Sequence, residues 1–98
     1  MKFEDKVYNL VKKIPRCKIS TYKIISEKLN SKAYRLVGQV LNKNPYKFIP
    51  CHRIVNSNKN IGGFNRGIKI KIKLLKKEGI KIRNNKVLNF ERVLYKFK

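Results

Sequence analysis

The sequence predicts a mainly α-helical domain with a small β component, and three observations support this fold class. Apolar residues recur at helical spacing at the start of the chain. Two short amphipathic segments follow, with a break at Asn30-Ser31 between them. Near the C-terminus, short apolar pieces flank Asn84-Asn85, as in a β-hairpin. With 98 residues the chain has the size of one domain, so we expect residues 1–98 to form a single unit.

The first predicted helix spans residues 3–14. Its apolar residues recur every three or four positions, with lysines between them: Phe3, Val7, Leu10, Val11 and Ile14. Asp5 lies in the first turn and Lys12 in the last, where the helix dipole favours each charge. Pro15 then ends the helix, because its ring and its missing N–H do not fit a helix interior.

A second and a third helix follow in close succession. Ser20 or Thr21 can cap the second, which continues to about Leu29. Ser31 can cap the third, which covers about 32–43. The third helix has an apolar stripe and an opposite polar face that carries basic residues: Lys32, Arg35, Gln39 and Lys43. Two short helices joined by a tight turn indicate a helix-turn-helix, although many small helical domains contain such a pair.

The segment 67–79 gives two conflicting indications. Residues 67–73 alternate strictly with lysine at every second position, which locally favours a strand. The continuation to Gly79 is typical of a helix that ends at a glycine. The local pattern alone slightly favours a strand for the first half.

Three further segments complete the expected fold. The segment 48–55 contains Pro50 and is too short for a helix, so we expect it to be extended. Short apolar pieces indicate a small hairpin within residues 80–88. Apolar residues within 90–97 indicate a last short helix.

The composition indicates a polyanionic partner. Lysine and arginine total 26 against 5 acidic residues, which gives a net charge of +21. Nucleic acid is the first candidate partner and an acidic membrane surface the second, and the alternative is biased coding that merely places solvated lysines at the surface.

Gly38 lies inside the third helix, where it costs about 1 kcal/mol relative to alanine. Either close helix packing or the close approach of a DNA backbone would explain it.

The sequence also bears on location and on metal binding. No apolar run approaches the length of a bilayer-spanning helix. Charges at positions 2–6 occupy the place where a signal peptide would be apolar, so we expect a cytoplasmic, nucleoid-associated protein. Cys17, Cys51 and His52 are too few to form a zinc site, so we expect no metal.

Cys51 and His52 provide the candidate chemistry. A cysteine attacks as a thiolate, so it needs a base, and the base needs an acid that orients it. His52 is the only histidine in the chain, and Glu78 is the acid that lies after this segment and before a turn. Neighbouring side chains of an extended segment point to opposite faces, so we expect a water molecule to connect Cys51 and His52. The alternative is a buried structural cysteine beside a surface histidine.

Residues 50–55, Pro-Cys-His-Arg-Ile-Val, resemble the active-site signature of the O6-alkylguanine-DNA alkyltransferases, also called methylated-DNA–protein-cysteine methyltransferases. The similarity covers about residues 3–79, in the order of the family's C-terminal catalytic domain. Its other motifs are Ile19-Ser20-Thr21-Tyr22, Arg35-Leu36-Val37-Gly38-Gln39, Asn44-Pro45, Gly62-Gly63-Phe64 and Leu74-Leu75-Lys76-Lys77-Glu78-Gly79. The resemblance implies a winged-helix-like, helix-turn-helix DNA-binding catalytic domain, and a helix instead of a strand at 67–77.

The resemblance implies a monomeric DNA-repair protein that acts once. Cys51 would take the alkyl group from O6 of guanine in double-stranded DNA by in-line displacement and keep it, so no cofactor would be needed. His52, oriented by Glu78, would deprotonate the thiol through a water molecule. Tyr22 would donate a proton toward guanine N3 or position the adjacent phosphate, and Asn44 would brace the active-site segment.

The resemblance also implies how DNA would be bound. The third helix would enter the minor groove, where Gly38 lets the DNA backbone approach and Arg35 fills the space of a base flipped out of the stack. The other residues implied to contact DNA are Lys32, Gln39, Tyr22 and Arg53. The pocket for the base and its alkyl group would contain Pro50, Val55, Phe64 and Asn65, and backbone groups around Cys51 and Val55 would read the guanine edge. The alternatives are a generic phosphate contact for Arg35 and an ordinary position at the core edge for Tyr22.

The sequence departs from the family pattern at several points. We expect the N-terminal domain that family members usually carry to be absent, because Phe3 already lies in the catalytic domain. The spacing from Asn44 to Cys51 is one residue shorter than is typical. Asn65-Arg66 stands where small residues, commonly glycine, line the alkyl pocket, so Arg66 would narrow that pocket or contact a phosphate. Cys17 stands where glycine is common and has no assigned role.

A second hypothesis is a lesion-binding protein without transfer activity, like the alkyltransferase-like proteins. These proteins keep the DNA-binding architecture but replace the cysteine, typically with tryptophan. Cys51, His52 and Glu78 favour transfer, whereas Arg66 and the missing N-terminal domain favour binding alone. A general basic nucleic-acid module would explain the charge but not the order of the motifs.

Overall fold

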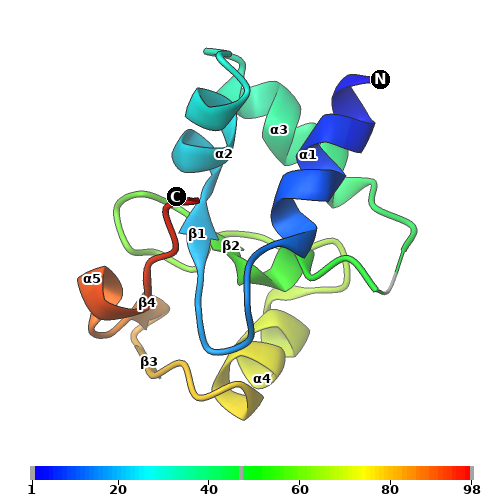
Figure 1. Ribbon diagram of the computed structural model, residues 1–98. Coiled ribbons are helices and arrows are strands. Elements are labelled where there is room, and N and C mark those ends of the chain that lie inside the picture. The colour runs from blue at the N-terminus through cyan, green and yellow to red at the C-terminus, as the bar shows by residue number, and fades with distance from the viewer. Residues whose placement is uncertain (1, 47, 98) are drawn as a thin grey trace.

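The computed structural model describes residues 2–46 and 48–97, and it confirms a mainly helical fold with small β elements. One half of the molecule is formed by α1 (Phe3–Lys12), α2 (Tyr22–Lys28) and α3 (Tyr34–Asn42). The other half contains α4 (Ile68–Lys77), β3 (Ile82–Arg83), β4 (Lys86–Val87) and α5 (Phe90–Val93). Between the halves lie the strands β1 (Ser20–Thr21) and β2 (Ile54–Val55), with the 3₁₀ turn η1 (Cys51–Arg53) leading into β2 (Figure 1).

The parallel pair β1–β2 joins the two halves of the core. Ser20 pairs with Ile54 and Thr21 with Val55. Consecutive strand residues point to opposite faces, so Ile54 packs with the first core group and Val55 with the second. The first group consists of Val7, Val11, Ile14, Ile25, Val37, Val40, Leu41, Ile49, Ile54 and Phe97. The second consists of Ile19, Val55, Ile61, Leu75, Ile80, Val87 and Phe90.

The helix-turn-helix pair α2–α3 forms, but the third helix begins later than predicted. The side chain of Thr21 caps α2, because its Oγ1 accepts a hydrogen bond from Ile24 N at 3.1 Å. Ser31 does not cap α3: its Oγ accepts from Ala33 N at 3.0 Å and so closes a turn before the helix. The predicted start at residue 32 is therefore wrong, and Lys32 is an exposed residue of the connecting turn.

Residues 68–77 form the helix α4, against the local alternating pattern and in agreement with the family resemblance. The residues of α4 that face the interior are Lys71 and Leu75, one turn apart, and both are fully buried. Ile68 and Ile70 are instead 41% and 37% exposed. The alternation of isoleucine and lysine therefore does not mark the buried face of this segment, which follows the 3.6-residue helical period.

The C-terminal segment forms the expected hairpin but only part of the expected helix. Asn84 and Asn85 both have positive φ angles, 51° and 60°, as a tight two-residue hairpin turn requires. Helix α5 ends at Val93, so the prediction of a helix through residue 97 is wrong. The chain continues beside β1 instead, where Tyr95 N donates to Ile19 O at 2.7 Å, and Figure 1 shows this tail in red next to β1.

Among the described residues, no helix has the length and apolar character of a membrane span.

Candidate functional site

Cys51 begins η1, where the sequence predicted an extended segment. Arg53 N donates to Pro50 O at 3.0 Å, which closes a single 3₁₀ turn, and the chain becomes extended only at Ile54. The prediction is therefore wrong for residues 51–53. Successive side chains of a 3₁₀ turn are about 120° apart and do not point to opposite faces. Cys51 and His52 consequently project from the same tight turn.

His52 contacts Glu78, as the resemblance implied. The distance from His52 Nε2 to Glu78 Oε2 is 3.1 Å, and the two side chains are 13% and 10% exposed. Burial lowers the pKa of His52 below its ordinary value and outweighs the opposite effects of the hydrogen bond and charge of Glu78. Burial alone would raise the pKa of Glu78, but the hydrogen bonds from Arg53 and His52 lower it overall.

These shifts fix the protonation of the pair at neutral pH. An ionised Glu78 only accepts hydrogen bonds, so Nε2 of His52 carries the proton and donates it. A neutral His52 then has its lone pair on Nδ1. The arrangement therefore provides a base whose tautomer is set by the carboxylate.

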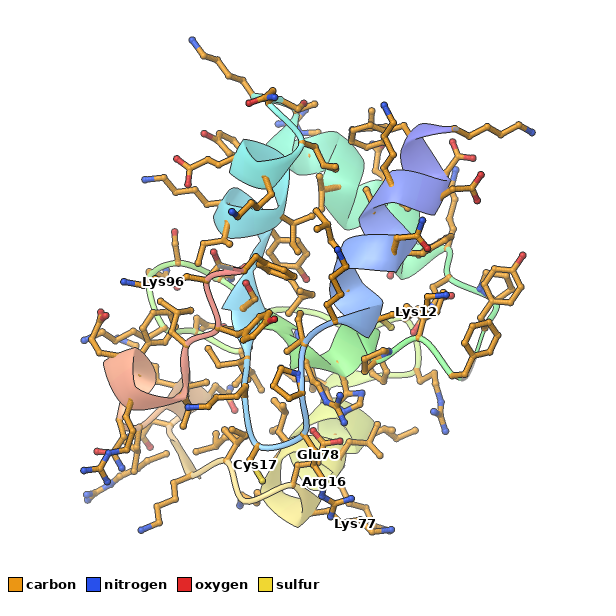
Figure 2. The ribbon with its side chains drawn as sticks, viewed as in Figure 1. Lys12, Arg16, Cys17, Lys77, Glu78 and Lys96 are labelled. Carbon is orange, nitrogen blue, oxygen red and sulfur yellow. The ribbon has the colours of Figure 1, made fainter. Side chains whose placement is uncertain are left out.

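Arg53 lies in this network and does not extend toward solvent. Its Nε and Nη2 donate to the two oxygens of Glu78 at 2.9 and 2.7 Å, and its Nη1 donates to Ile14 O at 2.7 Å. The side chain is only 15% exposed. The prediction that Arg53 contacts DNA is not supported, because its guanidinium is engaged within the protein and connects η1 to the end of α1 and of α4. Figure 2 shows Glu78 beside Arg16, whose Nη2 donates to the backbone oxygen of Lys77 at 3.1 Å.

Asn44 is positioned to brace the loop before Cys51, even though that loop is short. Its side chain is buried and donates to Ile49 O at 3.4 Å, while its Oδ1 accepts from Tyr46 N at 2.9 Å. Its backbone oxygen accepts from the side chain of Asn65 at 3.2 Å. Asn44 therefore connects the start of this loop, its end and the turn that contains Asn65.

Two cavities meet at Cys51. The first, of about 600 Å³, lies beside α3 and is lined by Tyr22, Tyr34, Arg35, Gly38, Gln39, Leu41, Asn42, Cys51, Asn56, Gly63, Phe64 and Asn65. The second, of about 320 Å³, is lined by Asn44, Pro45, Tyr46, Ile49, Cys51, His52, Phe64, Asn65 and Arg66. Cys51, Phe64 and Asn65 thus form the boundary between the two.

The structure brings Tyr22, Arg35, Gly38 and Gln39 together in the first cavity. Burial, followed by the charge of Cys51, raises the pKa of Tyr22, so its phenol stays protonated and can donate. A Cβ at Gly38 would meet only the ring of Tyr22, at 4.0 Å, which is an ordinary contact. Close packing within the protein therefore does not explain this glycine, and the close approach of a DNA backbone stays a prediction.

Some predicted pocket residues lie elsewhere. Val55 is fully buried in the second core group because it belongs to β2, and its side chain lines neither cavity. The implied contact of guanine with backbone groups around Cys51 and Val55 stays a prediction. Pro50 also lines neither cavity, since its place is at the start of η1. Phe64 and Asn65 line both cavities. Within residues 2–46 and 48–97, no group of three or more His, Cys, Asp and Glu side chains could hold a metal ion.

Lys71 is a residue of the site that the sequence analysis missed. Its side chain is fully buried, and its Nζ donates to Ile54 O at 2.7 Å and to Gly63 O at 3.0 Å. Burial lowers the pKa of Lys71 to about 8, while the charge of Cys51 acts in the opposite direction, so the two groups are close enough to interact electrostatically. Because the alternating pattern makes every lysine of 67–73 look solvent-facing, only its place one helical turn before Leu75 could have indicated burial.

Comparisons with known proteins agree with this geometry. The family model for the DNA-binding domain of 6-O-methylguanine DNA methyltransferase matches residues 2–80. A methylated-DNA–protein-cysteine methyltransferase of Saccharolobus solfataricus is 47% identical over 81 residues, which are 82% of this chain and 52% of the relative. The chain therefore spans about half the length of the curated relatives it matches.

Two solved structures resemble the fold in different ways. The O6-methylguanine-DNA methyltransferase of Pyrococcus kodakaraensis is 38% identical, with a TM-score of 0.74, over 82% of this chain and 47% of that one. Schizosaccharomyces pombe Atl1, in complex with damaged DNA containing O6-carboxymethylguanine, is 30% identical, with a TM-score of 0.83. The match to Atl1 covers 98% of this chain and 99% of that one.

Glu78→Gln should lower the free energy of unfolding at pH 7 by about 3 kcal/mol, because the half-buried guanidinium of Arg53 then has no carboxylate to pair with. The pKa of Glu78 is lowered in the folded protein, so this carboxylate stabilises the fold at every pH above 4.5, its ordinary pKa. The contribution is lost as the pH falls below 4.5 and through the lowered pKa. The difference between the two proteins should therefore shrink from pH 7 to pH 3 in urea unfolding. Glu27→Gln, which removes an exposed carboxylate, is the control. An equal loss of stability in Glu27→Gln would contradict the stabilising role of Glu78.

Lys71→Met tests the buried ammonium. Between about pH 8 and 10.5 the unfolded chain holds a proton on Lys71 that the folded chain has released, so this group makes the wild type more stable as the pH rises. The free energy of unfolding of the wild type, relative to Lys71→Met, should rise by about 2 kcal/mol from pH 7 to pH 10. Lys73→Met controls for a methionine on the same helix. A constant difference across this range would contradict the shift.

Proposed function

Because the chain belongs to the O6-methylguanine DNA methyltransferase family, we propose that it repairs DNA by moving an alkyl group from O6 of guanine to Cys51. One observation carries this proposal: Cys51 stands at the edge of a cavity beside α3, next to a histidine whose tautomer is set by a carboxylate. A nucleophile, a base and an orienting acid are the parts that thiol alkylation needs.

In the proposed reaction, His52 takes the thiol proton of Cys51 through a water molecule. The thiolate then attacks the alkyl carbon in line with the bond to O6. A sulfur–carbon bond forms, the carbon–O6 bond breaks, and its electron pair stays on the guanine. Tyr22, whose raised pKa keeps its phenol protonated, supplies a proton toward guanine N3, and the proton that His52 took from the thiol returns to the phenolate through solvent. The thioether on Cys51 has no leaving group that restores the thiol, so each molecule acts once.

DNA would be bound through α3 and the first cavity. Flipping a base out of the duplex costs a few kcal/mol of unstacking, and a side chain that fills the vacated space offsets part of that cost. Arg35 would take this role, and its exposed position on α3 beside the cavity supports it. Gly38, which the protein itself does not need for packing, gives the DNA backbone room to approach the same helix.

A lesion-binding function without transfer is the second candidate. The observation that favours it is the match to Atl1, which covers 98% of this chain with a TM-score of 0.83, whereas the match to the methyltransferase structure covers 82% with a TM-score of 0.74. The retained Cys51 and the pair His52–Glu78 favour transfer. The two candidates therefore differ in whether Cys51 becomes alkylated.

The deciding experiment is intact-mass analysis after incubation with a duplex that contains O6-methylguanine. The protein should gain one methylene, located on the peptide that holds Cys51, and the Cys51→Ala variant should gain nothing. Cys17→Ala, which removes the exposed second cysteine, is the matched control and should react like the wild type. Tight binding of the lesion without a mass change would overturn the transfer proposal and leave lesion binding.

Arg35→Ala tests base flipping. Transfer from duplex DNA should slow by about tenfold, whereas transfer from the free O6-methylguanine base should change little, because a free base needs no flipping. Arg83→Ala removes an exposed arginine of the hairpin that lines neither cavity, and so controls for the loss of one positive charge. Equal losses on the duplex and on the free base would rule out a flipping role.

A further inference from the structure

We propose that Arg66 makes this site selective for O6-alkyl groups that carry a negative charge, such as the carboxymethyl group. The inference rests on the alkylguanine-binding function proposed above and names a substrate class for it. The observation behind it is that Arg66, Cys51 and His52 line the same second cavity.

The second cavity is placed to receive a substituent of the alkyl group. Guanine enters from the first cavity, beside α3, and Cys51, Phe64 and Asn65 separate that cavity from the second. In an in-line displacement the sulfur, the alkyl carbon and O6 lie on one line, so the carbon's other substituents point sideways from that line. A methyl group has only hydrogens there. A longer alkyl group must place its additional atoms in neighbouring space, and the second cavity, of about 320 Å³, opens at the same cysteine.

Arg66 is the charged side chain that lines this cavity, apart from His52, which is held by Glu78. Among the described residues, the ion pairs are those of Glu78 with His52 and Arg53, and Arg66 takes part in none. None of the 5 acidic residues of the chain lines the cavity. On the other side of the turn, the buried ammonium of Lys71 interacts with Cys51. An anionic substituent would therefore meet a guanidinium that has no competing carboxylate.

Arg66 is presented by a turn that is held in place at several points. Gly67 N donates to Phe64 O at 3.0 Å and closes the turn. The side chain of Asn65 donates to Asn44 O at 3.2 Å, and Gly63 O, just before the turn, accepts from the buried Lys71. A fixed backbone limits the positions that the guanidinium can reach, so the order lost when an anion binds is mainly that of the exposed arginine side chain.

The reaction with such a group balances like methyl transfer. The thiolate of Cys51 attacks the methylene carbon of O6-carboxymethylguanine, the sulfur–carbon bond forms, and the carbon–O6 bond breaks. The electron pair leaves with O6, and the guanine takes up one proton. The product on the protein is S-carboxymethylcysteine, whose carboxylate stays beside Arg66. No oxidant, reductant or second substrate is required.

The test compares three duplexes that differ only in the O6 substituent: methyl, carboxymethyl and carbamoylmethyl. Carbamoylmethyl has nearly the shape of carboxymethyl but no charge, so the ratio of their transfer rates isolates the contribution of the negative charge. Arg66→Gln should lower the ratio of carboxymethyl to carbamoylmethyl rates by about fivefold, the effect of one partly exposed ion pair. Arg66→Lys should retain most of the preference. Arg83→Gln, an exposed arginine away from both cavities, should leave the ratio unchanged.

The outcomes separate this inference from its alternatives. An unchanged ratio in Arg66→Gln overturns it. An equal loss on all three duplexes also overturns it and identifies Arg66 as a phosphate contact. If the wild type alkylates Cys51 with none of the duplexes, the transfer proposal fails, and equilibrium binding then decides the inference. In the Cys51→Ala background, Arg66→Gln should weaken binding of the carboxymethyl duplex about fivefold more than binding of the carbamoylmethyl duplex, and equal weakening overturns selectivity by charge.

Discussion

The carboxylate of Glu78 is the group on which the geometry of the site depends. It accepts two hydrogen bonds from Arg53 and contacts Nε2 of His52, and Arg53 also donates to Ile14 O at the end of α1. One carboxylate therefore orients the base and connects η1, α1 and α4. In a chain with a net charge of +21, the half-buried guanidinium of Arg53 would be without a counter-charge if Glu78 were absent. The orientation of His52 and the connection of η1 to the segment that follows α1 thus both depend on the bonds of this carboxylate.

Helix α4 supplies both buried charges of the site from a single face. Lys71, Leu75 and Glu78 are spaced four and three residues apart, so they lie on one side of the helix. Lys71 binds backbone oxygens of β2 and of the loop at Gly63, and Glu78 binds the side chains of η1. Leu75 between them belongs to the second core group. The helix therefore holds η1, β2 and the loop at Gly63 in position relative to one another, which explains why a charged side chain is kept inside so small a core.

Sequence motifs predicted the chemistry of the site better than periodicity predicted its structure. The contact between His52 and Glu78 followed from the resemblance, since one histidine and one suitably placed acid left little choice. Periodicity failed where a polar residue takes an inward position: Lys71 looked like a surface lysine because its burial depends on two carbonyls from distant segments. Arg53 was assigned to DNA for a related reason, because a partner 25 residues away is not visible in a local pattern. Tertiary hydrogen bonds of this kind determine burial, and they lie outside what spacing can show.

The geometry of the site also depends on the C-terminal tail, which lies beyond the region that matches the family model. Residues 81–97 lie outside the matched part of the chain, yet Val87 and Phe90 complete the second core group and Phe97 the first. The tail also satisfies the backbone of β1: Tyr95 N donates to Ile19 O, and the hydroxyl of Ser20 donates to Tyr95 O at 3.1 Å. Because β1 leads directly into Tyr22 at the start of α2, the tail helps to fix the proposed proton donor against Cys51. The geometry of the first cavity therefore depends on residues that belong to neither the active-site signature nor the helix-turn-helix.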